Sequence, residues 1–470
     1  MARALAPKLA LARAVGTLSR LRGGGGTSAP GKVLIRLEPE AIGALGRRLE
    51  LGSLIVSATN GKTTTASMAA GIFEHAGVEL VHNQAGANMA GGIATTLLAA
   101  ARPRGRIAGE LGLFEVDELW LPALVEELHP RAILLGNLFR DQLDRYGELE
   151  TIAERWHDAV RRSSARLVLN ADDPQIADLG RERADVVYFG VEDDSLAMPG
   201  MAHAADAKHC QRCGAPYVFD EIYLGHLGHY HCDSCGQRMP MPAIIASEVR
   251  LEGVRSARFR LRTPAGEADV KLALPGLYNV YNALAAAALA GAMNVPLPSI
   301  VAGLAGTRAA FGRAESVSVS LNGAGAARAG VGSRELRILL VKNPAGANEV
   351  LRTLALEPGE HDLLIMLNDN IADGRDVSWI WDVDFELLAG RIRRVTCSGT
   401  RAAELALRLK YAGVDGDRIH VRDGIEAALR EASADRTDAD APLYALPTYT
   451  AMLALRELLV ARGEASSAWS

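Results

Sequence analysis

The sequence predicts an α/β protein in which helices cover parallel sheets, divided into two domains with a small cysteine-rich insertion. Short apolar runs such as LIVSA (54–58) and RLVLNAD (166–172) alternate with longer amphipathic segments, a pattern typical of strand–helix–strand units. A Gly/Ala-rich stretch at 322–332, NGAGAARAGVG, interrupts this alternation. We therefore place the main domain boundary there.

Length and composition narrow the class of protein. A chain of 470 residues is long enough for two or three domains, and 49% hydrophobic with 23% charged residues is typical of a folded globular protein. A net charge of −5 gives no electrostatic reason to expect a nucleic-acid partner. No apolar run reaches the length of about 18 residues that a membrane span requires. The Ala-rich stretch 283–295 instead predicts a packed helix.

The N-terminal 30 residues predict a basic helix followed by a Gly-rich joint. Residues 1–22 carry five cations and no acid, with Leu and Ala at helical spacing. Arg13 interrupts the apolar core that an export signal would need. Both a partly exposed helix and a contact with a membrane surface fit this pattern. The joint is GGGGTSAP (23–30), and the last residues, 463–470, predict a flexible tail.

The segment TNGKTT (59–64) follows the first predicted strand and precedes a helix predicted from about Thr65. Backbone N–H groups and the helix dipole converge at such a junction, which therefore binds anions. In a phosphate-binding loop, Lys62 would contact the β- and γ-phosphates and the Thr63 hydroxyl would bind Mg²⁺. Val56 occupies the first glycine position of the longer form of this motif. A helix cap without a ligand is the structural alternative.

Four cysteines form two pairs with the spacing of a zinc ribbon: Cys210, Cys213, Cys232 and Cys235. Two residues separate the members of each pair, 18 residues separate the pairs, and a glycine follows each pair. Four thiolates complete a tetrahedron, so the zinc would be structural. Two disulfides are one alternative, and ligation by His209, His229 or His231 is another. The fifth cysteine, Cys397, predicts a buried thiol rather than a nucleophile.

Several segments resemble motifs of the Mur ligase superfamily and lie in the same order along the chain. They are TNGKTT, GNLFRDQLDRYGE (136–148), LPGLYNVYNALAA (274–286) and FGRAE (311–315). Together with the cysteine ribbon, LLVKNPAGANEVLR (339–352) and LNDNIADGRDVSWIWDVDFE (367–386) are similar to the MurT family. The resemblance implies a Mur ligase-type central ATP-binding domain over 31–320, with the ribbon inserted at about 205–240. It also implies a Rossmann-like α/β domain over 333–462.

The resemblance also implies a set of residues that bind ATP and Mg²⁺. They are Thr59, Asn60, Gly61, Lys62, Thr63, Thr64, Glu115, Asn279, Asn282 and Arg313. The amides of Asn279 and Asn282 could read an adenine edge or a ribose, or form an N-cap beside a solvated Asn. Glu115 and Asp117 follow an apolar strand and could hold Mg²⁺ or begin an acidic helix.

The loop after the strand AILLGN holds further candidates. Asp141, Asp144 and Arg145 fit either the site or a solvated turn. Gln142 replaces the histidine of the superfamily motif, and the segment 148–160 has no lysine where relatives carry a carbamylated one. These departures leave the metal coordination at that side of the site open.

The reaction implied by the resemblance is an amidation in peptidoglycan biosynthesis. ATP would phosphorylate the α-carboxylate of D-glutamate in the stem peptide of lipid II, and ammonia would then displace phosphate to give D-isoglutamine. Lys62 would stabilise the phosphates, and a GatD-like glutaminase would supply ammonia within a heterodimer. The enzyme would work in the cytoplasm and meet the inner membrane face through its lipid-linked substrate.

An aspartate of the segment 367–386 would complete the Cys–His pair of the glutaminase as a triad. Asp373 is the first candidate, Asp376 the second and Asp369 the third, and a polar loop capped by its own acids is the structural alternative. Trp379 and Trp381 would pack at the subunit contact or in the core.

Two other function classes compete with amidation. An amino-acid ligase of the Mur or folylpolyglutamate type would need an amino-acid pocket and no glutaminase. A zinc-ribbon binding module with a regulatory ATPase would need a basic face, but the ribbon from 209 to 235 carries little Lys or Arg.

Overall fold

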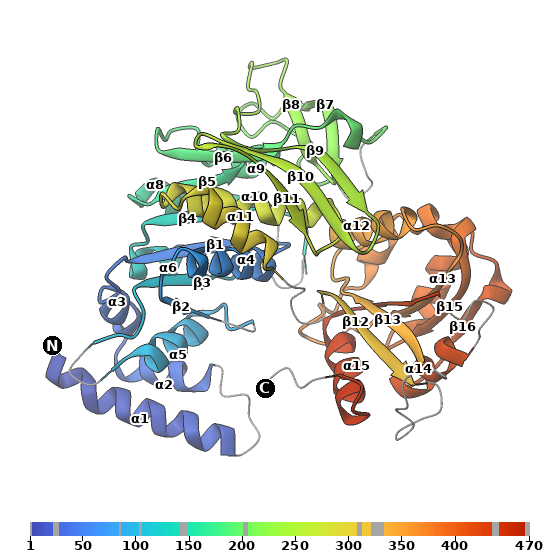
Figure 1. Ribbon diagram of the computed structural model, residues 1–470, viewed down its shortest axis with the longest axis horizontal. Helices are drawn as coiled ribbons and strands as arrows, with labels where there is room; N and C mark the ends of the chain where they lie inside the picture. Colours follow the sequence, from blue (N-terminus) through green and yellow to red (C-terminus); the bar gives the residue numbers. More distant parts are fainter. Residues whose placement is uncertain are drawn as a thin grey trace.

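The computed structural model has two large sheets that lie beside each other, each covered by helices (Figure 1). It describes residues 2–21, 28–83, 86–102, 106–141, 149–200, 205–307, 313–320, 333–434 and 441–465. The predicted α/β class is confirmed. Among the helices within these ranges, none combines the length and the apolar composition that crossing a membrane requires.

The first sheet has nine strands in the order β11-β10-β9-β6-β5-β4-β1-β3-β2. The pairs from β2 to β9 are parallel, whereas β10 runs antiparallel to β9 and β11. The strands are β1 (Ser53–Ser57), β2 (Leu80–His82), β3 (Leu111–Glu115), β4 (Ala132–Leu135), β5 (Arg166–Asn170), β6 (Val186–Val191), β9 (Ile244–Glu252), β10 (Ser256–Thr263) and β11 (Gly266–Leu272).

Helices bury both faces of this sheet. In β1, Leu54 and Val56 enter one apolar core and Ile55 enters the other, because successive side chains of a strand point to opposite faces. The Leu54 face is covered by α4 (Lys62–His75), α10 (Leu277–Ala292) and α11 (Leu297–Ala305). The Ile55 face is covered by α1 (Ala2–Leu21), α2 (Ala29–Leu37), α3 (Ala41–Gly46), α5 (Ala90–Ala100), α6 (Leu121–Leu128), α8 (Leu149–Arg162) and α9 (Pro174–Asp178).

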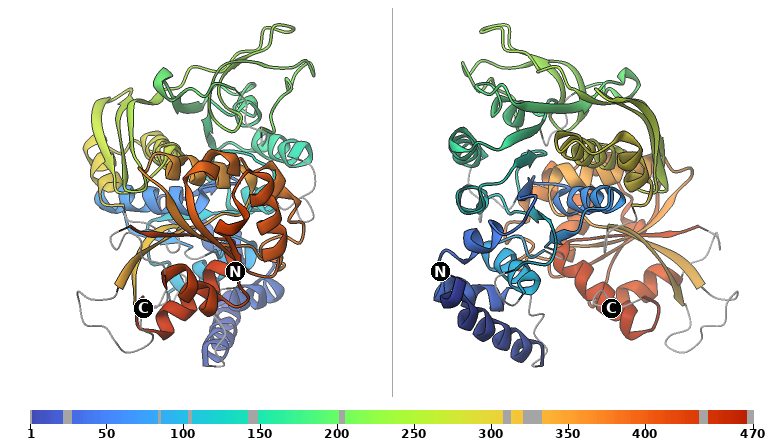
Figure 2. Two further views of the ribbon diagram at one scale, coloured as in Figure 1. Left: turned by 90° about the vertical axis from the view of Figure 1, so that its right-hand side faces the viewer. Right: turned by 60° about the vertical axis from the view of Figure 1, so that its left-hand side comes forward.

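The predicted Ala-rich helix is α10, which is buried along nearly its whole length. Figure 2 shows α10 enclosed between the parallel strands and the curved extension β9–β11. Small side chains allow the helix to be surrounded on all sides. The N-terminal basic helix is α1, which packs through Leu5, Leu9 and Ala12 and leaves Leu11 and Leu18 exposed. Residues 23–27 of the predicted joint lie outside the described residues.

The second sheet has six strands in the order β12-β13-β17-β14-β15-β16, parallel except for β12. Its strands are β12 (Arg313–Ser320), β13 (Ser333–Leu339), β14 (His361–Met366), β15 (Ile392–Ser398), β16 (Ile419–Val421) and β17 (Leu443–Pro447). Its helices are α12 (Pro344–Ala355), α13 (Ala402–Tyr411), α14 (Ile425–Ala434) and α15 (Tyr449–Ala461), with short 3-10 turns at η3 (Ser378–Asp382), η4 (Phe385–Arg391) and η5 (Gly416–Arg418). A separate hairpin, β7 (Val218–Leu224) and β8 (Leu227–His231), leaves the first domain after the turn η2 (Asp194–Leu196).

Two details of the structure differ from the sequence prediction. The helix after the first strand begins at Lys62 rather than Thr65, because Gly61 adopts a left-handed φ of 82° and ends the loop early. The strand β12 falls inside the range expected for the central domain, 31–320, yet it pairs with β13 of the second sheet. The chain therefore leaves the first sheet before residue 313 rather than after residue 320.

Candidate functional site

The loop after β1 lies at the carboxyl edge of the first sheet, where ligands bind in parallel α/β folds. Gly61 combines its positive φ with close packing, since an added Cβ would lie 2.0 Å from Asn282 Oδ1. No other residue fits there without strain. The N-terminus of α4 therefore opens directly into the loop, with Lys62 as its first residue.

The Lys62 ammonium lies in a buried ion pair. Its Nζ is 2.9 Å from both carboxylate oxygens of Glu118, and it also donates to the Ala58 carbonyl. Burial lowers the pKa of Lys62, but the carboxylates of Glu118, Glu115 and Asp117 outweigh it and hold the pKa above its ordinary value. The lysine is therefore a fixed positive charge at the mouth of the loop.

Three buried acids lie at the end of β3 and in the residues that follow it, and they face this ammonium: Glu115, Asp117 and Glu118. The Glu115 backbone N–H donates to Asn83 Oδ1 at 2.8 Å, and its side chain accepts from Asn88 Nδ2 at 3.3 Å. Carboxylate oxygens are the ligands that Mg²⁺ prefers, so this donor set fits the implied ion. The sequence prediction missed Glu118; three acids within four residues after an apolar strand were the signal.

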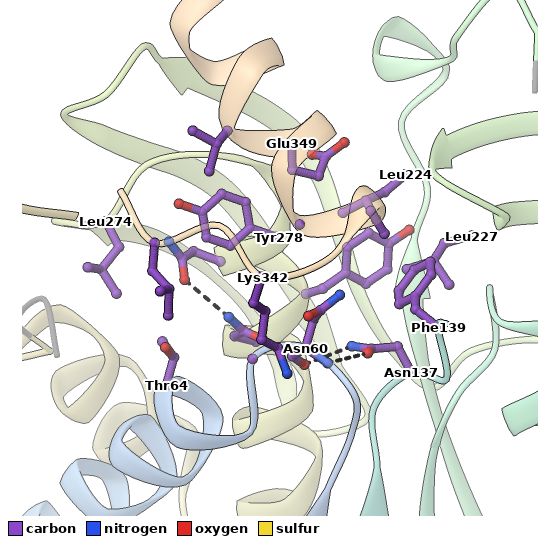
Figure 3. A pocket seen from close by; sticks show the side chains of 18 of the residues that line it. Asn60, Thr64, Asn137, Phe139, Leu224, Leu227, Leu274, Tyr278, Lys342 and Glu349 are labelled. Carbon is purple, nitrogen blue, oxygen red and sulfur yellow. Dashed lines mark hydrogen bonds between the residues drawn. The ribbon is translucent and has the colours of Figure 1, made fainter. Parts of the chain in front are cut away.

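A pocket extends from this loop into the space between the two sheets (Figure 3). Its polar end is lined by Asn60, Gly61, Thr64 and Lys342. Its other end is apolar and aromatic, and is lined by Phe139, Leu224, Leu227, Tyr278 and Tyr281 together with Glu349 of α12. Burial raises the pKa of Glu349 to about 7. One end of the pocket therefore suits an anion and the other suits a flat ring.

Both asparagines of α10 line the pocket and are buried. The helix is capped by Gly276, so the predicted alternative of an N-cap beside a solvated Asn is wrong. Asn282 Oδ1 accepts from the Thr65 hydroxyl at 3.2 Å, and its amide donates to Asn279 Oδ1 at 3.1 Å. Asn279 also donates to the Pro275 carbonyl at 2.7 Å. These bonds fix both amides against the loop.

The second domain contributes two side chains that the sequence prediction missed. Asn343 accepts from Gly346 N at the start of α12 and exchanges hydrogen bonds with Asn60, at 2.9 and 3.3 Å. Lys342 Nζ lies 2.7 Å from Asp141 Oδ2. The sequence pattern indicated the segment 339–352 only as a whole. The contact between Asn343 and Asn60 joins residues about 280 apart in sequence, a pairing that local pattern does not reveal.

The remaining predicted site residues are placed less fully. Thr59 hydrogen-bonds to the Phe139 backbone, and Thr63 is half-buried at the start of α4. Arg313 begins β12, but its side chain lies outside what the structure describes. Asp144 and Arg145, with Gln142, also lie outside the described residues.

The three aspartates after β14 differ in their surroundings. Asp373 is 5% exposed and accepts from both the backbone N–H and the hydroxyl of Thr450. Asp376 is exposed and accepts from Ser378 N at 2.8 Å, while Asp369 pairs with Arg401 at 3.1 Å and accepts from Thr400. Hydrogen bonds from Ser378 lower the pKa of Asp376 below its ordinary value. Asp376 is therefore an exposed anion, whereas Asp373 holds the loop in place.

The tryptophans beside this loop also differ. Trp379 is half-buried against the apolar core of the second domain. Trp381 is 49% exposed, and its ring lies edge-on to that of Tyr411, with 5.7 Å between the ring centroids. The Arg408 guanidinium lies 5.7 Å from the Trp381 ring.

The four cysteines converge as their spacing predicts. One ligand atom from each lies within 4.8 Å of the others, with Cys210 and Cys232 buried and Cys213 and Cys235 exposed. Four sulfurs at this separation fit a tetrahedral metal site with no open position. The histidines near the ribbon are not part of the cluster found among the described residues.

Comparison with known proteins agrees with this geometry. Two family profiles match the chain: the Mur ligase middle domain over residues 56–219 and the MurT ligase C-terminal domain over residues 340–452. The pseudomurein peptide ligase type C of Methanothermus fervidus has a similar fold, with a TM-score of 0.66 and 22% identity over 89% of this chain and 80% of that one. The folylpolyglutamate synthase of Mycobacterium tuberculosis has a TM-score of 0.58 at 15% identity, over 91% and 96% of the two chains.

Fold and site together define an enzyme of the Mur ligase class. A Streptococcus pneumoniae (strain ATCC BAA-255 / R6) protein named lipid II isoglutaminyl synthase (glutamine-hydrolyzing) subunit MurT is 32% identical over 447 residues, 95% of this chain and 94% of that protein. The protein of the same name from Staphylococcus aureus (strain N315) is 31% identical over 96% of each chain. The chain belongs to the MurT family.

Proposed function

We propose that this protein is the ATP-consuming subunit of a lipid II isoglutaminyl synthase. It converts the α-carboxylate of D-glutamate in the lipid II stem peptide to the amide, through an acyl phosphate, with ammonia from a GatD-like glutaminase. The observation that carries the proposal is the charged Lys62 beside three buried acids, directly after Gly61, which lines a pocket between the two domains.

The site has the parts that carboxylate activation needs. A carboxylate is a poor acyl donor, and transfer of a phosphoryl group makes it a good one when the phosphate charge is neutralised. Lys62 and the N–H groups at the start of α4 would hold the phosphates. Glu115 and Glu118 would hold Mg²⁺, which supplies charge neutralisation at the transferred group. Binding of the phosphates would replace the ion pair between Lys62 and Glu118.

The cysteine inventory supports a separate glutaminase. The chain has five cysteines. Four form the Cys₄ cluster, and the fifth, Cys397, is buried in β15, where burial raises the pKa of its thiol to about 12. Thiolates that bind a metal are not free to act as nucleophiles, and the buried Cys397 thiol lacks the low pKa that glutamine hydrolysis by a Cys–His pair requires. A partner would therefore release ammonia, in line with the word "subunit" in the relatives' names.

We expect an aspartate of the loop after β14 to complete the catalytic triad of the partner glutaminase. The exposed Asp376 and the half-exposed Asp369 could reach a partner's imidazole directly, whereas Asp373 would act by fixing the loop. Trp381, exposed beside this loop, would pack at the subunit contact. The lipid-linked substrate would bring the heterodimer to the inner face of the membrane.

The test is a reconstitution with purified components. The chain is incubated with lipid II, Mg²⁺-ATP, glutamine and a GatD-type glutaminase, and the muropeptide product is analysed by mass spectrometry. We expect the amidated product only when ATP is present, and we expect ammonium to replace glutamine and the glutaminase together. A product joined to an added amino acid, with none formed from ammonia, would instead establish an amino-acid ligase.

A further inference from the structure

The Cys₄ ribbon and the nucleotide pocket lie at opposite ends of one hairpin. The β7–β8 register pairs Val218 with His231 at one end and Leu224 with Leu227 at the other. His231 directly precedes Cys232, and Val218 follows Cys213 by five residues. The two leucines line the apolar end of the pocket (Figure 3). Any shift of the hairpin at its cysteine end therefore reaches the pocket wall.

The pocket end of the hairpin is seated on the first domain without free space. Gly225 has a φ of 61°, and an added Cβ would lie 2.8 Å from the Phe139 ring. The His226 side chain is 0% exposed, and its ring lies 4.6 Å from that of Phe139. Gly228 N donates to the Asp172 carbonyl at 2.9 Å. Phe139 itself lines the pocket, so the β7–β8 hairpin and the loop after β4 together form one wall of the pocket.

The same hairpin touches the second domain. Arg352 of α12 donates to the Tyr223 carbonyl at 3.2 Å and to Glu349 at 2.8 Å. Glu349 also lines the pocket. The hairpin therefore contacts both domains that enclose the pocket.

At the cysteine end, Asp178 at the end of α9 joins the ribbon to the first domain. Arg212 and Gln237 donate to its Oδ1 at 3.2 and 3.3 Å, and the Cys210 thiol donates to Gln237 at 2.9 Å. An isolated two-stranded hairpin is marginally stable in water. Metal binding by clustered cysteines supplies folding free energy. The strands are therefore expected to keep their position when the metal is bound.

We propose that the β7–β8 hairpin is a metal-dependent wall of the nucleotide pocket: the metal at the Cys₄ cluster fixes the hairpin, and Leu224 and Leu227 then close on the base of a purine nucleoside triphosphate. The proposal rests on the proposed function for the nucleotide. It assigns the ribbon a role in nucleotide affinity, while the loop around Lys62 binds the phosphates.

The first experiment tests the wall. Dissociation constants of the full chain for Mg²⁺-ATP and for tripolyphosphate are measured by titration calorimetry. Leu227→Ala removes buried apolar contact with the base and should weaken ATP binding about tenfold, with tripolyphosphate affinity unchanged. The control is Val218→Ala at the other end of the hairpin, where the side chain is 41% exposed. Equal ATP affinity of the Leu227 variant and the wild type would overturn the proposal.

The second experiment tests the metal. The wild type is stripped with a chelator, its metal content is measured by atomic absorption, and Cys213→Ser serves as a variant that cannot be reloaded. We expect ATP affinity to fall about tenfold, to return when Zn²⁺ is added to the wild type only, and hydrogen exchange of β7 and β8 to rise. An unchanged affinity of the stripped, folded chain would refute the metal link.

Two outcomes separate this proposal from the proposed function. If stripping unfolds the whole chain, the metal stabilises the entire fold, which refutes a metal effect confined to the hairpin, and Leu227→Ala then tests the wall by itself. If the wild type gives no amidated product but the ATP affinities follow the expected pattern, the proposed function is refuted and the role of the hairpin as a pocket wall is supported. Failure of the wild type to bind ATP would overturn both.

Discussion

Two loops each follow the carboxyl end of an inner parallel strand, one in each sheet of this protein, but their surroundings differ. The loop after β1 is enclosed, and its Lys62 is buried in an ion pair. The loop after β14 follows an inner strand of the second sheet, yet it presents Asp376 and the 77% exposed Ile371 to the surface. An enclosed loop can surround a small anion, whereas an exposed loop can meet another protein. In our proposal the two loops therefore serve two kinds of recognition.

The sharpest test of the enclosed loop is Lys62→Ala. It removes the charge that faces the phosphates and leaves Glu118 buried without its partner, so ATP-dependent amidation should fall by about 10³-fold or more. The rate of amide formation from ammonium measures this. Lys32→Ala, at an exposed lysine of α2, is the control and should retain full activity. A Lys62 variant with more than a tenth of the wild-type rate would contradict our assignment of the loop.

The exposed loop should show a different defect. Asp376→Asn removes the anion offered to the partner and should lower glutamine-dependent amidation by about 10² to 10⁴-fold, while activity with ammonium stays near that of the wild type. Asp373→Asn should show the same split, because it loosens the loop at Thr450. The matched control is Asp415→Asn, at an aspartate with a 73% exposed side chain after α13. Equal loss with both nitrogen sources would exclude this role.

The contact between the domains should have a smaller effect. Asn343→Asp keeps the acceptor for Gly346 N but loses the amide that donates to Asn60. Loss of one hydrogen bond beside the phosphate loop should raise the KM for ATP by about threefold to tenfold. The thermal midpoint should change little, whereas Asn343→Ala, which also removes the helix cap, should lower it. An unchanged KM would mean that Asn343 acts only as a cap.

The smallest effect concerns stability alone. Asp172 is fully buried beneath the hairpin, and burial raises its pKa to about 7 despite hydrogen bonds from Tyr281 and Val191. A raised carboxyl pKa means that the protonated form is favoured in the folded state, so stability falls as pH rises from about 4 to about 7. Asp172→Asn carries no charge and should lose this dependence. The thermal midpoint of the variant minus that of the wild type should therefore be about 4 °C larger at pH 8 than at pH 5.5.

A matched melting series checks that prediction. The comparison is the difference in midpoint between the variant and the wild type at each pH, which removes the contribution of other titrating groups. Glu182→Gln, at a surface acid with a 61% exposed side chain, should show no such difference. A constant difference between pH 5.5 and pH 8 would show that Asp172 is ionised throughout.

Local pattern was sufficient for the features that depend on nearby residues. The strands β1, β4 and β5, the Ala-rich α10 and the convergence of the four cysteines all follow from short-range spacing. The exact start of α4 did not, because it depends on the left-handed Gly61 packed against Asn282. The pairing of β12 was also missed, since strand partners are chosen across the chain.

The sequence by itself determined the α/β class, the phosphate-loop motif and the clustering of the four cysteines, because each depends on residues close together in the chain. Only the tertiary structure decided which groups meet at the site. Glu118 pairs with Lys62, Asn343 with Asn60, and the turn of the β7–β8 hairpin lines the pocket. Those contacts depend on the packing of distant segments, which sets burial and therefore the charge state and the shape of the pocket.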